Sequence, residues 1–178
     1  GPSNYGSYTY NWVYLDNCTP GTEVALGVNA STYDPPSGLT TTRCYVRTVD
    51  DACGTNAYTS SVTVTVVADP TLSTPGYTNS TICAGGSSDV SVTASGGTGT
   101  IGYQWQYNNG GTWQNVTAGT PAGSTYTNAT TSSMTISGIS SASSYDYRCL
   151  VTSTGSDCNT ATSSTGTLTV VADPTVSA

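Results

Sequence analysis

The chain has 178 residues, a net charge of −7 and a charged fraction of 7%, with three Arg, no Lys and no His. Because phosphates and anionic lipids are bound by clustered Lys and Arg, this composition argues against nucleic-acid partners and against docking on acidic membranes. No apolar run approaches the ~20 residues that cross a bilayer, so we expect no direct membrane insertion.

The missing side chains also argue against catalysis. A Ser nucleophile needs a base, and without His and Lys neither a Ser-His-Asp triad nor a Ser-Lys dyad can be built. The six Cys form no C-x-x-C pair and have no His beside them, which argues against a metal site. We therefore predict no enzyme, no cofactor and no metal ion.

The first part of the chain, residues 1–67, has the pattern of the later strands of one β domain. Tyr8, Tyr10, Trp12 and Tyr14 recur with period two, which indicates a strand with one aromatic face. In chain order we expect further strands at Glu23–Val28, Arg43–Val49 and Ser60–Val67, with turns at Asp34–Gly38 and Asp50–Ala52.

A repeat links this part to the rest of the chain. The heptapeptide Thr-Val-Val-Ala-Asp-Pro-Thr at 65–71 recurs at 169–175, an offset of 169 − 65 = 104 residues. Two cysteines recur 105 residues on, Cys44 as Cys149 and Cys53 as Cys158. A match in motif, spacing and order predicts tandem units of about a hundred residues, joined by short, proline-stiffened segments.

The second unit, residues 68–171, is expected to be complete, and residues 172–178 to be the linker and the start of the next unit. A strong hairpin turn is predicted at Asn108–Gly111. Alternation predicts strands at Thr78–Cys83, Asp89–Ala94, Ile101–Tyr107, Thr112–Val116, Ser133–Ser137, Tyr145–Ser153 and Thr165–Val171.

This order of elements resembles the immunoglobulin fold. There, a Trp on strand C packs on the core, and a Tyr two residues before the strand F Cys forms the tyrosine corner. By position, Trp105, Tyr147 and Cys149 would take those parts, while Met134 and Ile136 would point into the core from strand E. The resemblance implies an all-β fold of tandem immunoglobulin-like β-sandwiches.

The first unit is expected to be incomplete. Trp12 would be its equivalent of Trp105, and Thr42 stands where the corner Tyr is expected. The unit enters at strand C, so without strands A and B half of its core has no cover. The tail after the second joint is too short to supply two strands of about five residues each. We interpret the chain as one window of a longer repeat polypeptide.

The six cysteines predict disulfides, and therefore an oxidising, extracytoplasmic compartment. Val90 or Val92 occupies the usual strand B position, so the usual bridge between strands B and F is absent or displaced. Cys149 could bridge to Cys158 across the F–G turn, or Cys83 at the end of strand A could reach Cys158. Connectivity does not follow from the sequence alone.

Two aromatic residues flank the predicted hairpin turn. Tyr107 and Trp113 are expected to face one another across it, as a cross-strand pair. Their faces, with neighbouring amide side chains, would also suit stacking against a surface glycan.

Four stretches together resemble one protein family. They are Ser-Thr-Ile-Cys-Ala-Gly-Gly-Ser at 80–87, Gly-Tyr-Gln-Trp-Gln at 102–106, Tyr-Asp-Tyr-Arg-Cys-Leu-Val-Thr at 145–152 and Thr-Leu-Thr-Val at 167–170. The family is the immunoglobulin-like repeats of very large secreted Bacteroidetes surface proteins, including gliding-motility adhesins. The resemblance covers residues 69–172 and, more weakly, 1–68.

The resemblance implies export to the cell surface, with neighbouring repeats of the same polypeptide or filament as partners. It also favours a bridge between Cys83 and Cys158. In the first unit, Cys53 would then lack its strand A partner, and Cys18 and Cys44 would lie near each other.

Three functions remain in view. The favoured one is a structural and adhesive segment of a cell-surface adhesin or surface filament, acting as a disulfide-stapled rod. The others are a carbohydrate-binding or spacer module of a secreted enzyme, and a self-assembling filament subunit.

Overall fold

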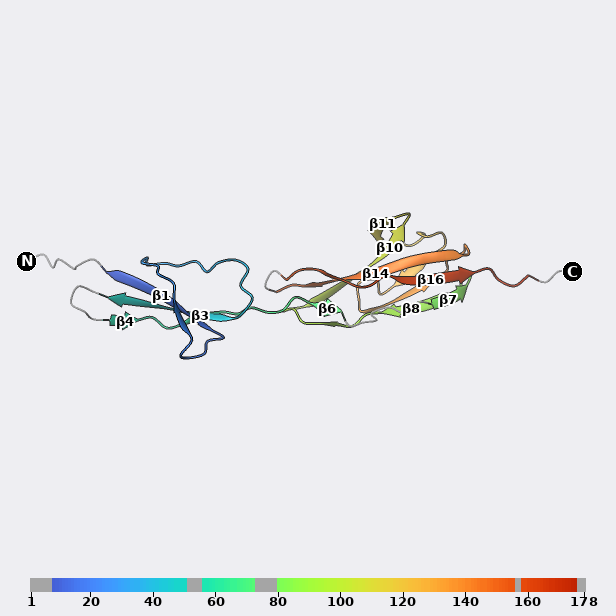
Figure 1. The fold of residues 1–178 in the computed structure, drawn as a ribbon. Helices are drawn as coiled ribbons and strands as arrows, with labels where there is room; N and C mark the ends of the chain where they lie inside the picture. Colours follow the sequence, from blue (N-terminus) through green and yellow to red (C-terminus); the bar gives the residue numbers. More distant parts are fainter. Residues whose placement is uncertain (1–7, 51–55, 73–79, 156–157, 176–178) are drawn as a thin grey trace, which may run out of the picture. The chain divides into compact units, whose positions relative to one another are not determined.

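The computed structural model describes residues 8–50, 56–72, 80–155 and 158–175. The chain divides into two compact units, Gly1–Val67 and Ala68–Ala178, which are treated separately below as unit 1 and unit 2. Every regular element among the described residues is a β-strand (Figure 1).

The described residues of unit 1 form one antiparallel sheet. The strands follow the order β2-β1-β3-β4, and β5 also pairs with β3. The central pair is long because β1 and β3 match over eight residues, from Thr9 opposite Asp50 to Asp16 opposite Arg43. The strands are β1 (Thr9–Asp16), β2 (Glu23–Ala25), β3 (Arg43–Asp50), β4 (Asn56–Tyr58) and β5 (Val62–Val64).

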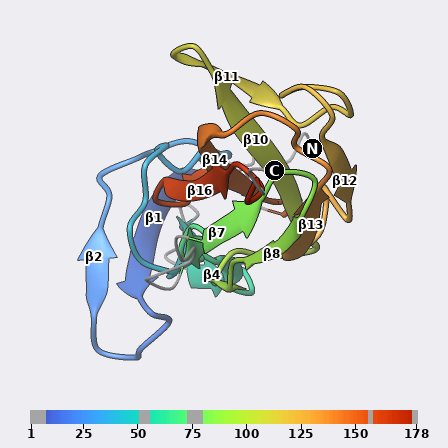
Figure 2. The same cartoon turned by 90° about the vertical axis from the view of Figure 1, so that its right-hand side faces the viewer.

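Unit 2 is built from two facing sheets and a short extra pair. The larger sheet has the order β11-β10-β14-β16-β7, with β15 also paired to β14, and the smaller has the order β12-β13-β8 (Figure 2). Its strands are β6 (Thr71–Leu72), β7 (Ser80–Cys83), β8 (Ser87–Ser91), β9 (Ala94–Ser95), β10 (Ile101–Asn109), β11 (Thr112–Asn115), β12 (Thr125–Thr127), β13 (Ser133–Ser137), β14 (Ser143–Ser153), β15 (Ala161–Thr162) and β16 (Gly166–Val171).

This strand order is that of an immunoglobulin-like sandwich. One sheet corresponds to strands C′-C-F-G with a first strand, β7, added in parallel beside G, and the other to D-E-B. The pair formed by β6 and β9 continues strands A and B toward the start of the unit. The predicted all-β, immunoglobulin-like fold is thereby confirmed.

The core of unit 2 lies between the two sheets. Trp105 on β10 and Tyr147 on β14 are fully buried, opposite Met134 and Ile136 of β13, which are also fully buried. Val90 and Val92 reach the same cluster from the strand B side. Alternation explains the pattern, because in each of these strands every second residue points inward.

The tyrosine corner is made by a different residue from the predicted one. Tyr145 donates its hydroxyl to the carbonyl of Ser141, four residues upstream, at 2.8 Å. Tyr147 instead points into the core, where its hydroxyl lies 3.1 Å from that of Tyr126. The sequence analysis assigned the tyrosine corner to Tyr147, whereas Tyr145, two residues earlier, forms it.

Candidate functional site

The strand registers show which residues of the two units are equivalent. In unit 2, Trp105 lies opposite Cys149 and Tyr107 opposite Tyr147. In unit 1, Trp12 lies opposite Arg47 and Tyr14 opposite Tyr45. Tyr107 follows Trp105 by two residues, as Tyr14 follows Trp12. The pairing of β1 with β3 therefore matches that of β10 with β14.

These registers correct one expectation and locate the strand F Tyr of unit 1. Arg47, not Cys44, is the counterpart of Cys149, because Cys44 lies opposite Leu15 and therefore on the other face of the sheet from Trp12. Tyr45 is the counterpart of the inward-facing Tyr147, and its exposed fraction is only 3%. At the place of the corner residue Tyr145, unit 1 has Arg43.

The indole nitrogens provide a second match between the units. Trp105 donates from Nε1 to the carbonyl of Thr131 at 2.9 Å, just before β13. Trp12 donates from Nε1 to the carbonyl of Ala30, also at 2.9 Å. The segment that follows Ala30 therefore occupies the place of strand E in unit 1, although no strand is formed there.

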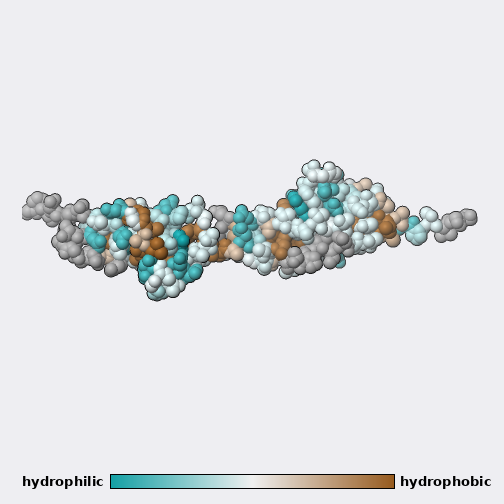
Figure 3. Space-filling model, in the orientation of Figure 1, coloured by the Kyte–Doolittle hydropathy of each residue, from teal (hydrophilic) through white to brown (hydrophobic). Residues whose placement is uncertain are grey.

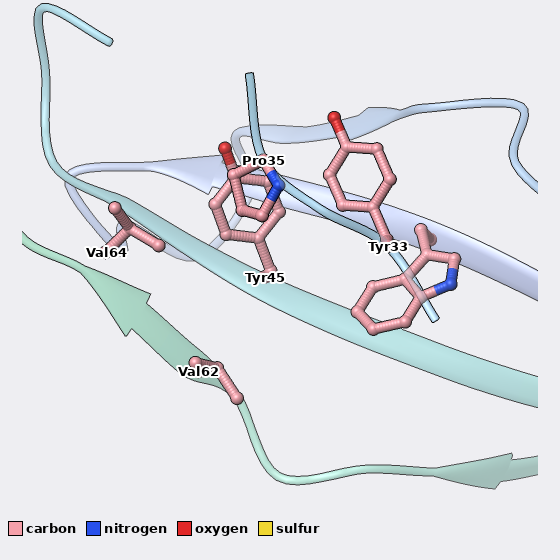
Figure 4. Close-up of a pocket in the computed structure, with 6 residues that line it drawn as sticks. Tyr33, Pro35, Tyr45, Val62 and Val64 are labelled. Atoms are coloured by element: carbon pink, nitrogen blue, oxygen red, sulfur yellow. The ribbon is translucent and has the colours of Figure 1, made fainter. Parts of the chain in front are cut away.

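A groove opens on this face of unit 1. It is a cavity of about 190 Å³ whose lining is almost entirely apolar. Figure 4 shows Tyr45 rising from β3, with Tyr33, Pro35 and the two valines of β5 around it. The ring centroid of Tyr33 lies 5.7 Å from those of Trp12 and Tyr45, which makes an aromatic wall. The lining residues are Trp12, Tyr33, Pro35, Tyr45, Val62 and Val64.

The groove exists because nothing among the described residues covers this face as strand B covers it in unit 2. Val62 is 63% exposed. Figure 3 shows apolar surface on unit 1. The sequence did place Val62 and Val64 on a strand, but the contribution of Tyr33 and Pro35 carried no periodic signal and was missed.

The disulfide of unit 1 lies on the opposite face of its sheet. Cys18 and Cys44 are bonded, with their Cα atoms 4.9 Å apart and a sequence separation of 26. The expected proximity of these two cysteines is confirmed. Cys53 lies outside the described residues.

The bridge favoured for unit 2 is wrong for this structure, where Cys83, Cys149 and Cys158 are free thiols. Cys83 lies beside Val171, at the far end of β16. Cys158 lies just before β15. The end of β16 pairs with β14 at Ser143, whereas β15 pairs with it at Val151, eight residues further along. At about 3.3 Å per residue, these two positions on β14 are about 26 Å apart. Disulfide bonding needs Cα atoms within about 7 Å.

Cys149 is a buried core residue rather than a bridge partner. Its backbone N–H donates to the hydroxyl of Ser163 at 2.8 Å, so Ser163 and not Cys158 faces it. Burial raises the pKa of the Cys149 thiol to about 11. The thiol therefore stays protonated and unreactive near neutral pH.

The expected aromatic pair at the hairpin does not form. Trp113 lies opposite Asn108, and Tyr107 opposite Gln114, so the two rings lie on opposite faces of the sheet. Tyr107 packs inward, with its ring centroid 5.5 Å from that of Tyr147. On the outer face, the guanidinium of Arg148 covers Trp113 at 4.4 Å from the ring centroid. The two aromatics cannot form one platform for a glycan.

Over the described ranges, no group of three or more His, Cys, Asp or Glu side chains is placed to hold a metal ion. In the same part of the chain, no helix has the length and hydropathy to cross a membrane.

Comparison with known proteins gives a likeness of fold. No family model matches the chain, and no curated protein matches it. An I-band fragment of titin matches 96% of this chain and 56% of its own length, at 13% identity and a TM-score of 0.47. The immunoglobulin domains of Sidekick-1 match 92% of this chain and 44% of theirs, at 14% identity and a TM-score of 0.40.

Fibronectin(III)-like modules of CbhA from Clostridium thermocellum match 97% of this chain and 82% of theirs, at 8% identity and a TM-score of 0.41. The chain spans about half the length of the titin fragment. The strand order described above gives unit 2 an immunoglobulin-like fold, which hosts structural and adhesive modules among many others.

Proposed function

We propose that this chain is a structural and adhesive repeat segment of an extracellular cell-surface adhesin or surface filament, of the kind that Bacteroidetes use in gliding motility. The observation that carries the proposal is the recurrence of one module. The heptapeptide at 65–71 returns at 169–175. The paired Trp and Tyr of β1 and β3 return in β10 and β14 with the same register.

The pairing of the end strands of unit 2 suits a load-bearing role. β7 and β16 run in parallel, with Leu168 beside Ser80 and Val171 beside Cys83. Tension applied through the two ends of the unit pulls β7 and β16 past each other along their length. All of their hydrogen bonds are then loaded together rather than one at a time. Such a unit resists extension until the whole pair gives way.

The Cys18–Cys44 disulfide supports placement outside the cell, because such bonds persist in oxidising compartments. Neighbouring repeats of the same polypeptide would be the partners of both units. Of the two aromatics considered for glycans, Tyr107 packs in the core and Trp113 lies under Arg148, so no observation favours the carbohydrate-binding alternative.

Single-molecule pulling tests the load-bearing part of the proposal. With handles at the two ends of the chain, unit 2 is expected to unfold at a clearly higher force than with handles at Asn109 and Val171, where the strands are peeled apart. Equal forces in the two geometries would refute it. The sequence of the parent gene gives a second test: further copies of the heptapeptide about 104 residues apart are expected, and their absence on both sides would refute the stalk.

A further inference from the structure

We propose that Cys83 of one repeat forms a disulfide bond with the counterpart of Cys158 in the repeat that follows it, so that each joint of the array carries a covalent bridge. The inference rests on the proposed function, because it needs a following repeat, and it names the contact that fixes the joint. Its basis is that these two thiols lie at the two ends by which unit 2 is connected to the rest of a polypeptide.

Cys83 lies at the end of unit 2 where the chain leaves. It lies beside Val171, the last residue of β16, and the N–H of the next residue, Ala84, donates to the carbonyl of Val171 at 2.9 Å. Ile82 packs against the core, whereas Cys83, the next residue of the strand, is exposed. The alternation of β7 therefore directs the thiol of Cys83 away from the core.

Cys158 lies at the opposite end, where the chain enters unit 2. Its neighbour Asn159 donates from its backbone and its side chain to the carboxylate of Asp69, at 2.9 and 2.8 Å. Cys53 stands 105 residues before Cys158, so the cysteine of this segment recurs from unit to unit. The two ends of unit 2 are about 26 Å apart along β14, too far for a bond within one unit.

The heptapeptide shows which residues meet at a joint. The segment 169–175 repeats 65–71, so Asp173 has in the following repeat the place that Asp69 has in unit 2. A counterpart of Asn159 is therefore expected to hold Asp173, with a cysteine one residue before it. The contact that unit 2 displays at its own entry thus carries the cysteine of the following repeat to the joint.

The joint is short enough for the two thiols to meet. Cys83 lies beside Val171 at the spacing of neighbouring strands, about 4.8 Å. From Val171 to Asp173 the chain spans at most about 7 Å. Only Ala172 lies between them, and rotation there can bring the two cysteine Cα atoms within the roughly 7 Å that a disulfide needs. The tether also gives the pair an effective concentration in the millimolar range, which separate molecules do not reach.

An oxidising compartment supplies the chemistry. The thiolate of Cys83 attacks a disulfide oxidant, such as oxidised glutathione, and displaces one thiolate. The thiolate of the following repeat then attacks the sulfur of Cys83, which forms the bridge and displaces the second thiolate. Each displaced thiolate takes up a proton lost by a protein thiol, so two protein thiols are oxidised while one disulfide is reduced to two thiols. Cys149 is buried and takes no part.

The test extends the full chain by one repeat, with a second copy of residues 75–178 placed after Ala178 so that the heptapeptide keeps its period of 104 residues. The protein is folded in a glutathione redox buffer. Peptide mapping by mass spectrometry without reductant should show Cys83 of unit 2 joined to Cys158 of the appended copy in most molecules. Circular dichroism checks that each variant folds.

Matched variants locate the bond. Cys83→Ser in unit 2 should abolish the cross-linked peptide, and so should Cys158→Ser in the appended copy. The same replacements made in the other copies, Cys158→Ser in unit 2 and Cys83→Ser in the appended copy, lie away from the new joint and should leave the bond unchanged. Because Cys83 is exposed, its replacement should not unfold unit 2.

Three outcomes would overturn the proposal. They are a bond between Cys83 and Cys158 of the same copy, a bond between separate molecules that disappears on dilution, and two thiols that stay reduced in a buffer in which Cys18 and Cys44 are bonded. If the extended chain fails to fold, the same mapping of the natural polypeptide isolated from its own cells gives the answer.

Failure of this inference can be told apart from failure of the proposed function. A parent gene without further copies of the heptapeptide would remove the array itself. A parent polypeptide that has the repeats but keeps free thiols at its joints would remove the bridge and leave the array standing.

Discussion

Replacement of Trp105 by Phe tests whether unit 2 is organised around its buried indole. Trp105 is fully buried and donates from Nε1 to the carbonyl of Thr131 at 2.9 Å. Phe removes that hydrogen bond, about 1 kcal/mol, and roughly two methylene equivalents of buried surface, about 1.6 kcal/mol. We expect Trp105→Phe to lower the free energy of unfolding of unit 2 by about 2–3 kcal/mol.

For a unit of this size, that loss corresponds to a fall in melting temperature of roughly 10–20 °C. Differential scanning calorimetry and urea unfolding followed by circular dichroism would measure it. The matched control is Trp113→Phe on the outer face, where Phe keeps an aromatic face under Arg148 and the change should stay within about 0.5 kcal/mol. Equal losses in the two variants would refute the assignment of the core.

Three further outcomes are expected. Replacing both Cys18 and Cys44 by Ser should cost unit 1 about 3 kcal/mol, from the entropy of a loop with a sequence separation of 26, and should abolish the effect of reductant on its urea midpoint. In the native chain at pH 8, Cys149 should resist iodoacetamide while Cys83, the exposed thiol at the end of β7, is alkylated, as fragmentation mass spectrometry that localises the label to single residues would show. The side-chain amide and then the backbone N–H of Asn159 lower the pKa of Asp69. That contribution to stability is present above the unfolded pKa of about 3.9 and is lost as the pH falls through the lower folded value, so Asp69→Asn should lose less stability than the parent chain between pH 5 and pH 2.

Much of unit 2 was predictable because its long strands show their own periodicity. The strand Ser133–Ser137 was predicted with its observed bounds, since Met134 and Ile136 alternate with polar residues. The hairpin at Asn108–Gly111 follows from its turn residues, and both glycines there have positive φ. In contrast, β12 has one aromatic residue between two Thr, too short for any period, and exists because it pairs with β13.

The equivalence of the two units was harder to see. Cysteines stand out in a sequence, and their offset of 105 residues placed Cys44 against Cys149. A shift by an odd number of residues turns a strand over, and the register shows that Cys44 faces away from Trp12. The signal that would have corrected this was the spacing of two residues from Trp to Tyr in both units.

The state of the unit 2 cysteines could not have been derived from the sequence. Cys83 and Cys158 are separated by the length of the sandwich, a distance that depends on the parallel pairing of β7 with β16. Nothing local in the sequence distinguishes that arrangement from one in which the first strand runs beside the start of β16. Pairing of distant strands is a tertiary property.

The contacts of Asp69 have a consequence for how such units can be exchanged. Its carboxylate accepts from the side chain and the backbone of Asn159, at 2.8 and 2.9 Å, and the carbonyl of Ala68 accepts from Gly97. Ala68 and Asp69, which the sequence presents as a linker, are therefore hydrogen-bonded within unit 2. If unit 2 were moved to another protein with a boundary after Pro70, it would lose these hydrogen bonds. A boundary before Ala68 would keep all of them.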